Sequence, residues 1–235
     1  SMAAVIIKDM DAIKKEYGRK RRTAIENAEE AVYEEKKMEE MEVCFLMDRF
    51  GYMKLIDKNA YERNKEAVHN ENKYVFNCMN TDKICIFTDT GKMHTIKAVD
   101  IPLGRFRDKG TPVDNLSNYD SSQERMLYVA PVGQLRSDRL LFVTKTSMCK
   151  LVEGAEFDVA KRTIASTKLA DEDELIFIGS ASEMEQIVLQ SHGGCFLRFL
   201  AQEVSTMKKT ALGVRGMKLA DDDYLEHAYL LAGHQ

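Results

Sequence analysis

The feature that most constrains the fold of this sequence is an octapeptide that occurs twice. Residues 168–175 read KLADEDEL and residues 218–225 read KLADDDYL, so six of the eight positions are identical at a spacing of fifty residues. Each copy runs into an apolar segment, which is the pattern of a turn that leads into a β-strand. Two such copies indicate repeated supersecondary units that bury their apolar faces against one another. We expect the aspartates after Lys-Leu-Ala to cap tight turns.

A second element recurs ahead of these copies and earlier in the chain: an apolar run, a short polar turn and another apolar run, which is the signature of a β-hairpin. The turn positions are Gly51, Gly91, Ser147 and Gly194, which are 40, 56 and 47 residues apart. Four strands per unit at a period near 48 residues are typical of a propeller or a related array of blades. The sequence therefore predicts an all-β, propeller-like fold of about four blades over residues 42–235.

Residues 1–41 do not follow this pattern. Apolar residues recur at helical spacing from Val5 to Tyr17, and Gly18 is a residue type that commonly ends helices, so a helix is predicted over residues 4–17. The basic run GRKRRT and an acidic stretch over residues 26–42 follow. We expect residues 1–41 to be a helical linker outside the blades. In the alternative interpretation, Arg19 to Arg22 lie near DNA or near an acidic partner domain.

The composition is that of a globular protein able to bury a sizeable core. The 235 residues are 44% hydrophobic and 31% charged, and no apolar run reaches the length of a membrane span. The five cysteines form no CxxC pair and the five histidines share no spacing, so we expect reduced core thiols and no metal site. No nucleophile has a neighbouring base, so we expect neither catalytic residues nor a cofactor in this domain. The expected location is the cytoplasm.

Basic residues recur at one place in three of the predicted units, in the stretch that follows each hairpin. They are Arg105, Arg107 and Lys109 in the second unit, Lys161 and Arg162 in the third, and Lys208, Lys209 and Arg215 in the fourth. Clusters at one structural position would line a continuous path, which is the geometry that a long polyanion requires. The alternative is an ordinary solvated rim, and the residues alone leave both interpretations open.

Several stretches in the same order resemble a known family. GKMHTIKAVDIPLGRFRDKGTPVDNL, residues 91–116, is similar to the blade motif of the C-terminal β-pinwheel domain of bacterial gyrase and topoisomerase IV A subunits. The hairpins and the KLADxDxL repeat are similar as well, and residues 13–25 resemble the end of the coiled-coil arm that precedes that domain. The resemblance covers nearly the whole chain.

The resemblance implies a disc of blades with a DNA-binding outer rim. Such a domain is attached to the cleavage core of a type IIA topoisomerase and bends or captures a DNA segment for strand passage. The implied partners are duplex DNA, the catalytic core and the B subunit, with no membrane, and the implied location is the bacterial cytoplasm, in association with the nucleoid. The catalytic tyrosine, the metal-binding domain and the ATPase belong to other parts of such an enzyme. The family's basic blade positions fall on Lys54, Lys97, Lys150 and Arg198.

The chain departs from the family pattern in two respects. Gyrase A subunits carry a glutamine-arginine-arginine-glycine-glycine box after the first hairpin, whereas this chain has YERNKEAVHNENK, where only Arg63 and Lys65 offer positive charge near the start and no glycine occurs. This difference favours topoisomerase IV over gyrase. In addition, residues 42–235 hold 25 basic and 28 acidic residues, although a DNA-wrapping surface is ordinarily basic. A protein-binding array of blades therefore remains a hypothesis of another class, while an enzyme in its own right is the least favoured.

Overall fold

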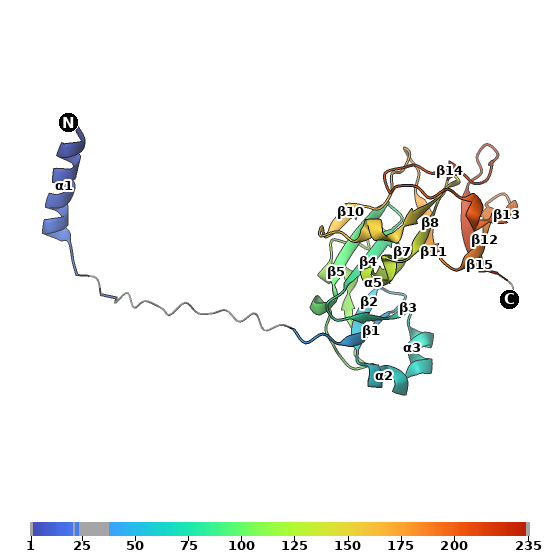
Figure 1. Ribbon diagram of the computed structural model, residues 1–235, viewed down its shortest axis with the longest axis horizontal. Coiled ribbons are helices and arrows are strands. Elements are labelled where there is room, and N and C mark those ends of the chain that lie inside the picture. Colours follow the sequence, from blue (N-terminus) through green and yellow to red (C-terminus); the bar gives the residue numbers. More distant parts are fainter. Residues whose placement is uncertain (1, 21, 24–37, 234–235) are drawn as a thin grey trace. The chain divides into compact units, whose positions relative to one another are not determined.

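The structure is a computed structural model that describes residues 2–20, 22–23 and 38–233. The chain divides into two compact units, Ser1–Met38 and Glu39–Gln235. In the first unit, helix α1 (Met2–Tyr17) confirms the predicted N-terminal helix, and the Gly18 N–H closes it on the Lys14 carbonyl at 2.9 Å (Figure 1). Most of the acidic stretch of the expected linker lies outside the described residues.

The second unit contains four antiparallel sheets, which we call blades 1 to 4 (Figure 1). Blade 1 has the order β3 (Tyr74–Met79), β1 (Glu42–Met47), β2 (Tyr52–Ile56) and β6 (Thr111–Pro112). Blade 2 has the order β10 (Thr163–Ala165), β5 (Lys92–Lys97), β4 (Lys83–Thr88) and β7 (Met126–Pro131). Blade 3 has the order β11 (Leu175–Ser180), β8 (Arg139–Thr144), β9 (Met148–Glu153) and β14 (Val214–Arg215). Blade 4 has the order β13 (Phe196–Leu200), β12 (Met184–Ser191) and β15 (Leu225–Ala232).

Consecutive blades are interlocked by strand exchange. After each of the hairpins β4–β5, β8–β9 and β12–β13, the chain crosses to the preceding blade, adds a short edge strand there, and then returns to its own blade. We call these the first, second and third crossing segments: residues 98–112, 154–165 and 201–215. Each begins with a 3-10 helix, namely η1 (Ala98–Asp100), η2 (Gly154–Phe157) or η3 (Ala201–Glu203). The predicted fold of about four propeller-like blades is confirmed.

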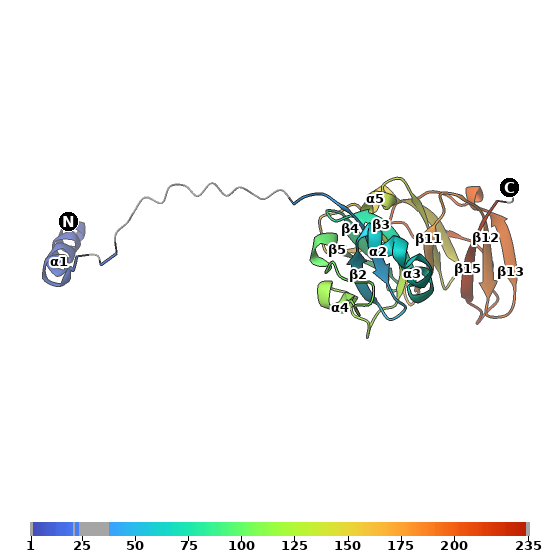
Figure 2. The same ribbon diagram turned by 90° about the horizontal axis from the view of Figure 1, so that it is seen from below.

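The blades follow one another with their faces packed together, as Figure 2 shows. One buried cluster joins blades 1 and 2, a second joins blades 2 and 3, and a third joins blades 3 and 4. In the second cluster, the Phe87 ring meets the Phe157 ring edge-on at a centroid distance of 4.9 Å. Because both faces of a central strand are covered, β1, β4 and β8 are runs of consecutive apolar residues rather than alternating patterns. Four cysteines are buried, and Cys195 is exposed.

The repeated octapeptide forms the same turn in both places. The N–H of Asp173 bonds to the Ala170 carbonyl at 3.1 Å, and Glu172 has a positive φ of 61°. The carboxylate of Asp173 accepts hydrogen bonds from the Glu174 N–H (2.9 Å) and from the Thr146 N–H (3.1 Å), and so joins the turn to the β8–β9 hairpin. The capping role expected of the motif is thus performed by its second aspartate. Asp171, the first aspartate, has an exposed side chain.

The second copy of the octapeptide behaves in the same way. Asp223 bonds to the Ala220 carbonyl through its N–H (3.2 Å), and its carboxylate accepts the Gly193 N–H at 2.9 Å from the β12–β13 hairpin. The Leu225 N–H then bonds to the Lys145 carbonyl of the preceding blade at 2.9 Å. The motif therefore fixes both the hairpin of its own blade and the distance to the neighbouring blade.

The polar stretch after the first hairpin folds into two short helices, α2 (Lys58–Arg63) and α3 (Lys65–Glu71), which the sequence pattern did not predict. Asp57 caps α2 by accepting the Ala60 N–H at 2.7 Å. Only Ala60 and Val68 are buried, in a small cluster beside β1 and β2. Two buried residues are too few to give a helical period in the sequence. Two further short helices, α4 (Val113–Leu116) and α5 (Val132–Leu135), follow β6 and β7.

Candidate nucleic-acid interface

The first and third crossing segments bring two of the predicted basic clusters to equivalent positions, on blade 1 and blade 3. In the first segment the Gly104 N–H bonds to the Leu55 carbonyl at 2.9 Å, and in the third the Met207 N–H bonds to the Leu151 carbonyl at 2.8 Å. A turn follows in both, which we call the basic turn: residues 105–108 in the first segment and residues 208–211 in the third. Its closing bond from the fourth N–H to the first carbonyl measures 3.1 and 3.0 Å, respectively. Arg105 and Lys208 therefore occupy the same place on different blades.

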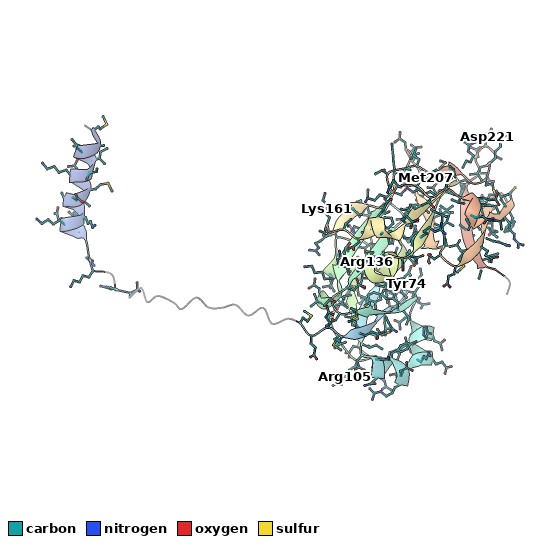
Figure 3. All side chains as sticks on the ribbon, in the orientation of Figure 1. Tyr74, Arg105, Arg136, Lys161, Met207 and Asp221 are labelled. Carbon is teal, nitrogen blue, oxygen red and sulfur yellow. The ribbon has the colours of Figure 1, made fainter. Side chains whose placement is uncertain are left out.

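Figure 3 labels one residue from each crossing segment: Arg105, Lys161 and Met207. In this view the three follow one another along the border of the second unit, from its lower left to its top. The exposed basic side chains of these segments are Arg105, Arg107, Lys109, Lys161, Arg162, Lys208 and Arg215. We call these exposed basic side chains, which lie on segments that add strands to blades 1, 2 and 3, the basic border. The same segments also carry five acidic residues: Asp100, Asp108, Glu156, Asp158 and Glu203.

Some of these side chains have partners that fix their orientation. The Lys109 Nζ lies 4.8 Å from the centre of the Tyr52 ring, a cation–π contact. Arg162 donates to the Leu116 carbonyl at 3.1 Å. Lys209, which is half-buried, donates from Nζ to the Glu156 carbonyl at 3.2 Å. These contacts engage the charged ends of Lys109, Arg162 and Lys209. Arg105, Arg107 and Lys161 are exposed.

Glu156 is an acidic partner of the basic residues Lys208 and Lys209 in the third crossing segment. Its carboxylate lies 3.3 Å from the Lys208 Nζ and accepts the Lys209 N–H at 3.0 Å. Burial raises the pKa of Glu156, but the hydrogen bonds from Lys209 and Lys208 outweigh it and bring the pKa below its ordinary value. The carboxylate is therefore ionised at neutral pH and neutralises part of the positive charge of the third crossing segment.

Lys150 is not available for DNA. Its side chain is 1% exposed, and Nζ donates to the carbonyls of Lys208 (3.2 Å), Lys209 (3.1 Å) and Ala211 (2.7 Å). A buried ammonium with three carbonyl partners cannot reach a phosphate, so we remove Lys150 from the set of proposed contacts. Lys54 is half-buried and donates to the carbonyls of Phe106 and Asp108 in the first crossing segment. It is likewise committed to the protein.

The four lysines and arginines that the family pattern assigned to one blade position are not structurally equivalent. Strand register places Lys54, His94, Lys150 and Leu197 at the same position, opposite Leu46, Ile86, Phe142 and Leu189. Lys97 lies at the end of β5, opposite Lys83, and its side chain is exposed. Arg198 is exposed on β13, where its Nε bonds to Gln186. The prediction of one shared position was wrong because it matched the blades by charge. Equivalent positions instead lie at the same distance from the hairpin turn.

Arg63 and Lys65 lie on α2 and α3 with exposed side chains. Ala67 and Glu71 of α3 line a hollow together with Arg107 and Lys109 of the first crossing segment. Arg63 and Lys65 are not among the residues that line this hollow, so the structure does not join them to the first basic cluster.

Sequence reasoning missed two exposed lysines beside these segments, Lys168 and Lys218. The N–H of Lys168 bonds to the Lys209 carbonyl at 3.1 Å, so Lys168 extends the third cluster. Lys218 holds the same place in the second copy of the octapeptide. Both lysines are the first residue of the repeated octapeptide, and this shared position could have identified them from the sequence.

His94 and Glu124 form a buried polar cluster in blade 2. The His94 Nε2 and a Glu124 carboxylate oxygen are 2.9 Å apart, and the His94 Nδ1 lies 2.9 Å from the Thr163 hydroxyl of the second crossing segment. Burial raises the pKa of Glu124, but hydrogen bonds from His94 and Thr88 lower it by more. Since every member of this polar cluster is hydrogen-bonded within the protein, we infer that the cluster holds the crossing strand β10 against blade 2. Among the described residues no group of acidic, cysteine and histidine side chains is arranged to hold a metal ion.

Solved structures with the same fold define the class of this domain. It superposes on the C-terminal domain of DNA topoisomerase IV with a TM-score of 0.74 at 22% identity, over 83% of this chain and 62% of that one. It also superposes on the C-terminal domain of gyrase A with a TM-score of 0.51 at 18% identity, over 81% and 65%. The fold is therefore the β-pinwheel of topoisomerase C-terminal domains.

Residues 82–121, 138–182 and 185–232, more than half of the chain, match the family described as DNA gyrase C-terminal domain, beta-propeller, and the chain belongs to this family. Among curated relatives, the DNA gyrase A protein of Clostridium acetobutylicum is 29% identical over 224 residues, 91% of this chain and 27% of the relative. That of Salmonella typhimurium is 29% identical over 231 residues, 93% and 26%. The chain thus spans about a quarter of the length of these relatives. No helix in the described parts of the chain is long and apolar enough to cross a membrane.

Proposed function

We propose that this chain is the DNA-binding C-terminal domain of a topoisomerase IV A subunit, which binds or bends duplex DNA along its basic border and presents a segment for strand passage. The observation that carries the proposal is the recurrence of basic residues on the crossing segments of successive blades. Lysine and arginine at loops and strand ends position a phosphate backbone without reading base edges, so binding is tolerant of sequence. The proposed partners are the cleavage core and the B subunit of a bacterial, nucleoid-associated enzyme in the cytoplasm, which would supply all of the chemistry.

The choice of topoisomerase IV over gyrase rests on the segment after the first hairpin. Where gyrase A subunits are expected to have a glycine- and arginine-rich box, this chain forms α2 and α3, with Asp57 capping the first helix. A capped helical pair is a different surface from a glycine-containing loop. The curated relatives named above are gyrase A subunits, so gyrase is the alternative within the class.

The test of DNA binding is a fluorescence-anisotropy titration of the full chain with a duplex at two salt concentrations. We expect binding at about 50 mM salt that weakens steeply by about 200 mM, since counterions released from phosphates make affinity salt-dependent. The excess of acidic residues supports one hypothesis of another class, a blade array that binds protein. Absence of binding to duplex DNA at low salt would refute the proposal and favour that alternative.

A further inference from the structure

Lys150 and Lys54 hold the same structural element in two different pairs of blades. The Nζ of Lys150 bonds to the carbonyls of Lys208, Lys209 and Ala211, and the Nζ of Lys54 bonds to those of Phe106 and Asp108. Counted from the start of each crossing segment, Phe106 corresponds to Lys209 and Asp108 to Ala211. In both cases the ammonium therefore binds the inner carbonyls of the basic turn defined above.

The second crossing segment supplies a natural comparison, because it has no such turn. Fifteen residues separate Ala98 from Val113, whose N–H bonds to the Gly51 carbonyl of the blade 1 hairpin. Gly216 likewise lies fifteen positions after Ala201, and its N–H bonds to the Ser147 carbonyl.

In the second segment only twelve residues separate Gly154 from the equivalent Ser166. At the position of Lys54 and Lys150 this blade has His94, which lies 2.9 Å from the hydroxyl of Thr163. The strand residue that bonds to the crossing segment thus varies with the length of the segment. It is a lysine for the two long segments and His94 for the short one.

The turn needs a donor at this place. Backbone carbonyls that point inward are costly if they are left without a partner, and a lysine ammonium offers three N–H groups to one small volume. A turn fixed from inside by its carbonyls directs its side chains outward, and in these two turns the outward side chains include Arg105, Arg107 and Lys208. Ordering them before DNA arrives removes part of the entropic cost of binding.

We propose that Lys54 and Lys150 are positioning residues for DNA binding, each holding one basic turn by its backbone carbonyls so that the turn's own side chains contact phosphate. The inference rests on the proposed function, because it assigns these lysines a role in that function without contact with DNA. It differs from a general role in stability, because their effect on affinity passes through the arginines and lysines of the turn. A double-mutant cycle detects that dependence.

The experiment uses the full chain and measures duplex binding by anisotropy as a function of salt. Lys54→Met is compared with the wild type, both alone and in a background in which Arg105, Arg107 and Lys109 are alanine. The matched control is Lys58→Met, which removes the same charge from an exposed position on α2. We expect Lys54→Met alone to weaken binding about tenfold at low salt and to reduce the salt slope by about 1, as for the loss of one phosphate contact. In the triple-alanine background it should change affinity less than about twofold.

Lys54→Arg retains a cation with several N–H donors and should recover most of the affinity. If Lys54→Met does not fold, Lys54→Gln, which keeps an amide donor, replaces it in the cycle. Wild-type affinity in Lys54→Met would refute the inference but leave the proposed function intact. An equal loss in both backgrounds would also refute it, because Lys54 would then act on DNA independently of the turn. No binding by the wild type would refute the proposed function itself.

Discussion

Replacing Arg105, Arg107 and Lys109 together by alanine tests the DNA path most directly. All three side chains are exposed on the first crossing segment, and their removal leaves the core and the carbonyls bound by Lys54 in place. Each phosphate contact adds about 0.9 to the slope of log affinity against log salt, so three contacts account for a slope of about 2.7. If about five contacts form in the wild type, its slope is near −4.5 and that of the variant near −2.

These slopes translate into a large difference in salt sensitivity. Between about 50 and about 200 mM salt, the wild type should lose roughly 500-fold in affinity and the variant only roughly 10- to 20-fold. The assay is a titration of labelled duplexes of several sequences, which should all weaken alike because phosphate contacts carry no base information. The control variant has alanine at Arg49, Lys58 and Lys73, three exposed charges of blade 1 outside the crossing segments. An unchanged slope in the first variant would place the DNA path elsewhere.

The remaining predictions concern the intact enzyme and the stability of the fold. A holoenzyme with this domain should relax and decatenate DNA without introducing negative supercoils, and ATP-dependent supercoiling of a relaxed plasmid would restore the gyrase assignment. Gly213→Ala should lower the free energy of unfolding by about 1 to 3 kcal/mol in urea titrations, since φ is +98° and the added Cβ would lie 2.7 Å from the Cys149 carbonyl oxygen. Asp173→Ala should cost about 1 to 2 kcal/mol through its lost bonds to Thr146 and Glu174, and Asp171→Ala should be neutral by the same measurement. Burial lowers the pKa of Lys150 to about 8, against an opposing effect of Glu156, so the unfolded chain binds more protons between about pH 8 and 10.5. The free energy of unfolding of the wild type should therefore rise relative to Lys150→Met by about 2 kcal/mol from about pH 8 to about pH 10, and a constant difference would contradict this reasoning.

The sequence predicted the blades because their signals are local. A hairpin requires a positive φ at its turn, and Gly51, Gly91 and Gly194 mark that place, with Ser147 adopting a φ of 71° in the same role. The strand exchange left no such signal. Strands β6 and β14 have two residues each, too few for any periodicity, and their partners lie about sixty residues away along the chain.

The candidate site was predictable to the extent that it consists of exposed charge in loops. Arg105 and Lys161 could be found because basic residues recurred after successive hairpins. Lys150 was predicted to contact DNA because the sequence of an apolar strand does not show whether a lysine within it faces solvent or a set of carbonyls. Those carbonyls belong to a segment nearly sixty residues later, contributed by the next blade. Only the pairing of strands between blades reveals that the charge is buried.

The acidic excess of the domain and a DNA-binding border are compatible because charge acts locally in salt. At physiological ionic strength the screening length is about 8 Å, so a phosphate at the border responds mainly to the groups nearest to it. The third crossing segment places Lys208 and Arg215 there, with the half-buried Lys209 and the adjacent Lys168, against the carboxylates of Glu156 and of the exposed Glu203. By contrast, Asp173 and Asp223 of the repeated turns are occupied in joining each turn to the hairpin of its own blade. The net charge therefore does not decide between DNA and protein as the partner, whereas the distribution of charge over the crossing segments favours DNA.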